Sequence, residues 1–139
     1  MKYIKLFDSY EKDYIKDSIN DILVELKDKN MLVEVWHWKP KKKWKMGEDH
    51  REYYTISIKG VFDRTIDYLE YGDSDLYRKY NTNLISDYVD TVIDFMQEFC
   101  PDFEVYFEYY DNGEVDLGES EKLIKNKEVV QTVFTFTKK

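Results

Sequence analysis

Two stretches of the chain have apolar residues at helical spacing. Residues 10–29 place Ile15, Ile19, Ile22, Leu23 and Leu26 on one stripe, which predicts an amphipathic helix. Ser9 is the expected N-cap of this helix, and Asn30 is the expected stop. Residues 83–99 predict a second helix, which ends before Pro101 because the residue before a proline avoids helical backbone angles. Its apolar stripe consists of Ile85, Tyr88, Val89, Val92, Ile93, Met96 and Phe99.

Other stretches alternate apolar and polar residues, or are rich in β-branched and aromatic residues, and so predict strands. These stretches are residues 32–38, 53–59, 103–110 and 129–137. Gly60 is expected to end or bulge the second of them. Asn112-Gly113 predicts a two-residue hairpin turn that folds residues 114–117 back along the preceding strand. The low charge of residues 129–137 indicates a strand that is central in the sheet or covered on both faces, and residues 63–71 are compatible with a short helix.

These elements predict an α+β fold in a single domain spanning residues 1–139. We expect a curved antiparallel sheet of about four to five strands with two main helices packed on one face. The order helix, strand, turn, strand occurs twice, and Asp21–Leu26 resembles Asp94–Phe99. This similarity indicates an α-β-β unit used twice, about 70 residues apart. The alternative is that any amphipathic helix followed by a strand resembles any other.

The composition excludes several classes of protein. The chain of 139 residues has 42% hydrophobic residues, which argues against disorder, and no apolar run long enough to span a membrane. The absence of a signal-peptide pattern and the single Cys100 are typical of a cytoplasmic protein. His37 and His50 show no metal-ligand spacing, and we expect Cys100 to be a buried structural thiol. We therefore expect no metal, no cofactor and no enzymatic activity.

Charge is strongly segregated along the chain. The net charge is −8, but residues 63–121 hold three Lys/Arg against 17 Asp/Glu, a net −14. In the predicted second helix, Asp87, Asp90, Asp94 and Glu98 fall at i, i+3, i+7 and i+11, so they share one stripe with no lysine between them. Together with Glu104 and Glu108 they predict a partner-binding face that imitates a phosphate backbone and docks a basic site. The alternative is a solvated face of an acidic protein.

A second candidate surface has the opposite charge. Tryptophans and lysines alternate in the segment that follows the first predicted strand, and they have the chemistry for base stacking and phosphate contact. The alternative is a hairpin loop whose tryptophans pack on the sheet while its lysines stay in water. The residues concerned are Trp36, Trp38, Lys41, Lys42, Lys43 and Trp44.

Met1–Tyr10, together with Asp21–Asp28, resembles the start of many small uncharacterised proteins of large tailed phages. The resemblance covers about the first 35 residues of the chain and is not specific to any activity. It implies a virus-encoded accessory protein in the cytoplasm of a bacterial host. By analogy, such a protein is a non-enzymatic inhibitor of a host protein, for example a defence nuclease. A structural virion component and an immunity protein against a basic nuclease toxin remain alternatives, and the oligomeric state is undetermined.

Overall fold

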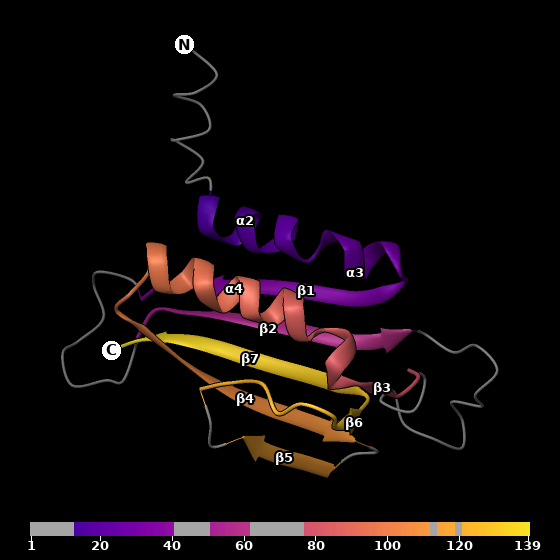
Figure 1. Cartoon of the computed structure of the whole chain (residues 1–139). Coiled ribbons are helices and arrows are strands. Elements are labelled where there is room, and N and C mark those ends of the chain that lie inside the picture. The colour runs from indigo at the N-terminus through magenta and orange to yellow at the C-terminus, as the bar shows by residue number, and fades with distance from the viewer. Residues whose placement is uncertain (1–12, 41–50, 62–76, 112–113, 119–120) are drawn as a thin grey trace.

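The computed structural model describes residues 13–40, 51–61, 77–111, 114–118 and 121–139. Their fold is α+β, as predicted: a five-stranded antiparallel sheet has helices packed on one face (Figure 1). The elements in chain order are α2 (Tyr14–Ile22), α3 (Val24–Asp28), β1 (Met31–Trp38), β2 (Tyr53–Val61), β3 (Tyr80–Asn81), the 3-10 turn η2 (Thr82–Leu84), α4 (Ser86–Phe99), β4 (Phe103–Asp111), β5 (Glu114–Gly118), β6 (Glu128–Val129) and β7 (Gln131–Lys138).

The first predicted helix is two helical segments, which meet at Leu23. Asp13 is the N-cap of α2, since its carboxylate accepts a hydrogen bond from the Lys16 backbone N–H. Ser9, the predicted cap, lies outside the described residues. Asn30 adopts a φ of 66° after α3, which confirms it as the stop because asparagine tolerates the left-handed region.

The second helix, α4, begins at Ser86, three residues later than predicted. The preceding residues form the turn η2, in which the Asn81 side chain accepts a hydrogen bond from the Asn83 N–H. Polar side chains that bond their own backbone favour such turns over a continuing helix. The helix ends at Phe99 before Pro101, as predicted.

The strands follow the predicted alternation, with two refinements. The pairing of β1 with β2 shifts from Met31–Val61 to Leu32–Lys59, so Gly60 is an extra residue, which confirms a bulge there. A Cβ at Gly60 would lie 1.8 Å from the Arg78 carbonyl oxygen, so this close approach requires glycine. Asp111 pairs with Glu114, as a two-residue hairpin connection requires, and Asn112-Gly113 lie outside the described residues.

The last predicted strand is divided, and its longer part is central. Glu128–Val129 form β6, which pairs with β3, whereas β7 begins at Gln131. The strand order is β1-β2-β7-β4-β5, so β7 joins the two hairpins (Figure 1). The central position of this strand is confirmed. The predicted helix at residues 63–71 lies outside the described residues.

The core lies between the sheet and the helices. One row of paired positions runs across four strands and consists of Val35, Ile56, Phe134 and Phe107. All four residues are buried. Helices α2, α3 and α4 contribute Ile19, Leu23, Leu26, Val89, Val92 and Met96 to the same cluster. Burial of this apolar area is the main favourable term in folding.

Helix, strand and strand do follow one another twice, as α2/α3-β1-β2 and α4-β4-β5. The two units occupy different places in the sheet, however. β1 is an edge strand, whereas β4 is interior, and their antiparallel neighbours give β1 and β4 opposite directions. A common origin of the two units stays a prediction.

Candidate functional site

The predicted acidic stripe lies on the outer surface of α4. Asp87, Asp90, Asp94 and Glu98 are all exposed, while Val89, Val92 and Met96 face the core. Within the described residues none of the four carboxylates has a lysine, arginine or histidine at salt-bridge distance. Their charges are therefore uncompensated by close ion pairs, and neighbours at i+3 and i+4 repel one another.

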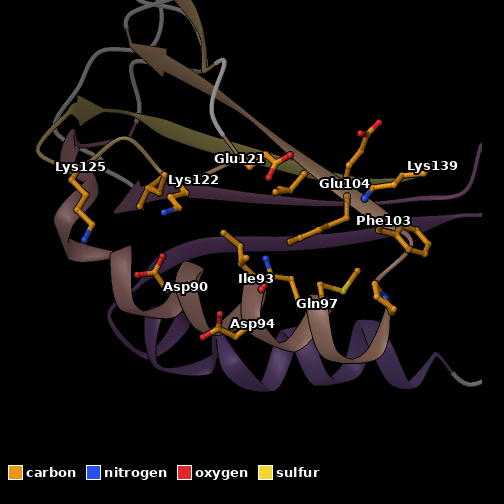
Figure 2. A pocket seen from close by; sticks show the side chains of 15 residues that line it. Asp90, Ile93, Asp94, Gln97, Phe103, Glu104, Glu121, Lys122, Lys125 and Lys139 are labelled. Carbon is orange, nitrogen blue, oxygen red and sulfur yellow. The ribbon is translucent and has the colours of Figure 1, made fainter.

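A cleft of about 700 Å³ separates α4 from residues 121–125 (Figure 2). Asp90 and Asp94 line its α4 wall, and Lys122 and Lys125 line the opposite wall. Glu104 also lines this cleft, but alternation along β4 directs its side chain to the opposite face of the sheet, away from Asp90 and Asp94 (Figure 2). Because lysines line it as well, the cleft is not a purely acidic site.

The face of the sheet that points away from the helices is open: no described helix lies over it. It carries a shallow trough of about 690 Å³. The floor of the trough is formed by small side chains of β2 and β7, including Thr55 and Thr135, whose hydroxyls lie 3.2 Å apart. The trough is lined by Trp38, Arg51, Tyr53, Thr55, Glu104, Tyr106, Glu108, Tyr110, Val133, Thr135 and Thr137.

Aromatic side chains project from the strands on the two sides of the trough. On β1, Trp36 is 46% exposed, and Trp38 stacks on Tyr53 with ring centroids 5.6 Å apart. On β4, Tyr106 is also 46% exposed. The register aligns Trp36 with Thr55, Thr135 and Tyr106 across four strands. The two aromatic sides are therefore three strand spacings apart, about 14 Å.

Carboxylates and tyrosines alternate along the β4 side of the trough. Glu104, Tyr106, Glu108 and Tyr110 project to this face because alternate residues of a strand share a face. The Tyr110 hydroxyl donates a 2.7 Å hydrogen bond to Glu108. This bond, with burial as a smaller cause, raises the pKa of Tyr110, so the phenol stays a donor and orients the carboxylate.

The structure therefore redistributes the predicted site residues. Glu104 and Glu108 share the open face with Trp36 and Trp38, which the sequence assigned to a different candidate surface. The acidic stripe lies in the helix layer instead, on the other side of the sheet. The remaining members of the tryptophan–lysine set, Lys41, Lys42, Lys43 and Trp44, lie outside the described residues.

Sequence reasoning missed a polar cluster around His37. One ring nitrogen of His37 contacts the Asp13 carboxylate, and the other lies 2.5 Å from Glu52. The imidazole is 10% exposed and stacks on Tyr54 at 3.9 Å. Burial, followed by the charges of Asp13 and Glu52, raises the pKa of Tyr54. Asp13, His37 and Glu52 are distant in the sequence. The one signal that could have indicated this cluster is the pairing of the strands that contain His37 and Tyr54.

Cys100 is buried at the end of α4, as predicted. Burial, reinforced by the Asp102 carboxylate, raises the pKa of this thiol, which therefore stays protonated near neutral pH. Within the described ranges, no three His, Cys, Asp or Glu side chains are grouped as they are around a metal ion. No helix among the described residues has the length and apolar character needed to cross a membrane.

Comparison with protein-family models, with curated proteins and with solved structures gave no match to this chain. Two surfaces stand out from the geometry of the described residues. They are the open face of the sheet, with its aromatic and carboxylate side chains, and the acidic outer surface of α4.

Proposed function

We propose that the protein is a non-enzymatic binding protein that docks a basic surface of a partner on the open face of its sheet. The observation that carries this proposal is the exposed Tyr106 ring, which lies between Glu104 and Glu108 on one strand face. An arginine or lysine of a partner gains from the face of an aromatic ring and from nearby carboxylates at the same time. Aromatic residues in shallow exposed patches are also typical anchors of protein interfaces.

The open face supports a basic protein partner better than a nucleic acid. Its β4 side offers two carboxylates, Glu104 and Glu108, and the described cation that lines the trough is Arg51. A polyanion approaching Tyr106 meets both carboxylates and the net charge of −8. The stacking surface alone suits both kinds of partner, and the charge favours a basic protein.

The test is a titration with a short arginine–serine peptide, followed by tryptophan fluorescence and by backbone amide NMR shifts. We expect shifts on the open-face residues of β1 and β4. The double variant Glu104→Gln/Glu108→Gln should weaken the affinity about two- to thirtyfold, since each exposed ion pair contributes about 0.2–1 kcal/mol. Trp36→Phe should report whether this tryptophan provides the fluorescence change.

The matched control is Asp90→Asn/Asp94→Asn, which removes two charges from the helix layer and leaves the open face unchanged. If this control weakens the peptide as much as the β4 variant does, the open face is not the site. If a single-stranded oligonucleotide binds at moderate salt and the arginine peptide does not, the nucleic-acid hypothesis for Trp36 and Trp38 replaces the proposal.

The outer surface of α4 supports a second candidate, namely an inhibitor that imitates nucleic acid. Its four carboxylates lie between positions 87 and 98, a rise of about 16 Å along the helix axis. Exposed Leu84 and Phe99 lie at the two ends of this helix. A phage-encoded inhibitor of a host nuclease would use such a surface. Loss of inhibition of a DNA-binding nuclease in Asp90→Lys/Asp94→Lys, with inhibition retained in Glu104→Gln/Glu108→Gln, is the result that selects this candidate.

A further inference from the structure

The β1 strand forms one edge of the sheet. It has eight residues, Met31–Trp38, and its only partner in the strand order is β2 (Figure 1). In an antiparallel pair, alternate residues direct their backbone N–H and C=O groups away from the partner strand. Along the described part of the chain, no strand accepts the outward groups of β1. The edge is therefore a ready template for a further strand.

Proteins usually protect such edges, and the two edges of this sheet differ in that respect. Short length, charged residues, lysines and prolines block additional pairing. The opposite edge, β5, has five residues, two of which are acidic. β1 contains no lysine and no proline, and Glu34 is its only Asp or Glu. Two of its large apolar side chains, Leu32 and Trp36, are exposed.

Two lysines of the helix layer lie on the flank above this edge. Helices α2 and α3 lie over β1, and α4 lies on one side of them, where Tyr88 donates a 2.6 Å hydrogen bond to Glu25 (Figure 1). Lys16, Asn20 and Lys27 fall at i, i+4 and i+11, on the opposite flank of the helices. Lys27 donates to the Asn20 side-chain oxygen at 3.0 Å, which holds this flank together. Both lysines therefore lie on the side of the helices that overlooks the free edge.

We infer that the β1 edge binds an extended acidic segment of a partner protein as a sixth strand. The backbone of that segment pairs with the outward N–H and C=O groups of β1, which is the established mode of strand addition. Its carboxylates on the helix side reach Lys16 and Lys27. A second copy of this chain fits less well, because two-fold pairing of β1 with β1 brings the lysine flank of one copy against the lysine flank of the other, and the two repel each other. The site uses the backbone edge of β1 and the lysine flank of the helices, whereas the open face uses side chains of β1 and β4, so this inference does not depend on the proposed function.

The probe is a short synthetic peptide of alternating glutamate and valine, titrated into the full-length protein and followed by amide NMR and hydrogen exchange. We expect shifts centred on β1 and on the flank of Lys16, with slower exchange of the outward β1 amides. The same peptide with alternate N-methylated residues keeps its charge and loses its donors, and it should not bind. Binding of the methylated peptide at equal affinity overturns strand addition.

Two protein variants test the role of the charge. Lys16→Gln/Lys27→Gln should weaken the glutamate–valine peptide several-fold and reduce the salt dependence of its Kd. Lys125→Gln, a lysine beside α4, is the matched control and should bind as the parent protein does. Equal binding of a lysine–valine peptide overturns the acidic specificity. A free-protein dimer in sedimentation, abolished by the glutamate–valine peptide, overturns the proposal and assigns the edge to a second copy.

Discussion

The two faces of the sheet contain similar residues and differ in what covers them. On β4, Phe107 is 1% exposed under the helices, whereas its neighbour Tyr106 points to the open face and is 46% exposed. The central strand repeats the contrast, since buried Phe134 alternates with Val133, which lines the trough. Aromatic content alone therefore does not distinguish core from binding surface. The position of the helices makes that distinction.

The largest test of this comparison substitutes neighbours on one strand. Phe107→Ala should lower the free energy of unfolding by about 3–5 kcal/mol, because it removes a large side chain and leaves a cavity in a packed core. Tyr106→Ala should change it by less than about 1 kcal/mol, since an exposed side chain has little packing to lose. Urea denaturation of the two variants measures both values. Equal losses would mean that the open face is packed against something in solution.

Removal of a tyrosine hydroxyl should have a smaller effect on stability, and that effect should differ between Tyr80 and Tyr110, which lie on opposite sides of the sheet. The Tyr80 hydroxyl donates to the Ile58 carbonyl at 2.7 Å and lies 2.9 Å from Thr132 Oγ1, all of it buried. Tyr80→Phe should cost about 1–3 kcal/mol, because buried polar partners are left unsatisfied. Tyr110→Phe should cost less than about 1 kcal/mol, because Glu108 can bond water instead. Thermal and urea unfolding at neutral pH compare the two variants.

The same pair of tyrosines predicts a dependence on alkaline pH. Burial raises the pKa of Tyr80 above its ordinary value of 10.0, so the folded state favours the neutral phenol. The stabilisation is complete below pH 10.0 and is lost as the pH rises toward the raised pKa of the folded state. Tyr80→Phe should therefore flatten the loss of stability above pH 10.0 more than Tyr110→Phe does. Parallel curves for the two variants would contradict this assignment.

The smallest expected effect concerns the outer surface of α4. Asp94→Asn should raise the free energy of unfolding by about 0.4–1 kcal/mol at low salt, since it removes repulsion from Asp90 and Glu98. High salt should shrink the gain. Asp87→Asn is the control, because Asp87 lies in the first turn of α4 and interacts favourably with the helix dipole. If Asp94→Asn gives no gain at low salt, the stripe is compensated in a way that the described ion pairs do not provide.

Local patterns predicted most of the elements, because they depend on neighbouring residues. The alternation in β4 gave the correct buried face. The apolar stripe of α4 did so too except at Phe99, which is 59% exposed because it lies at the end of the helix. The interruption at Leu23 was not visible, since the apolar stripe continues through it. The order of the strands could be predicted only in part. The low charge of residues 129–137 indicated a central strand, but no local pattern identifies the strands that pair with it.

The candidate sites were harder to predict, because they join distant residues. Trp36 and Glu108 are on one face only because β2 and β7 lie between β1 and β4. His37 meets Asp13 and Glu52 across separations of 24 and 15 residues. Residue type identified the tryptophans and carboxylates as candidates but not the His37 cluster, and the sheet topology decided which candidates share a surface.

The central place of β7 has a consequence for how the protein is made. Phe134 pairs with Ile56 and Phe107, so the strand that joins the two hairpins is synthesised after both. Two-stranded hairpins are marginal by themselves, and pairings between distant residues form slowly. During translation the inner edges of β2 and β4 therefore remain open until β7 has emerged from the ribosome. We expect the nascent chain to be most prone to aggregate in that interval, because unpaired strand edges and apolar surface are then exposed.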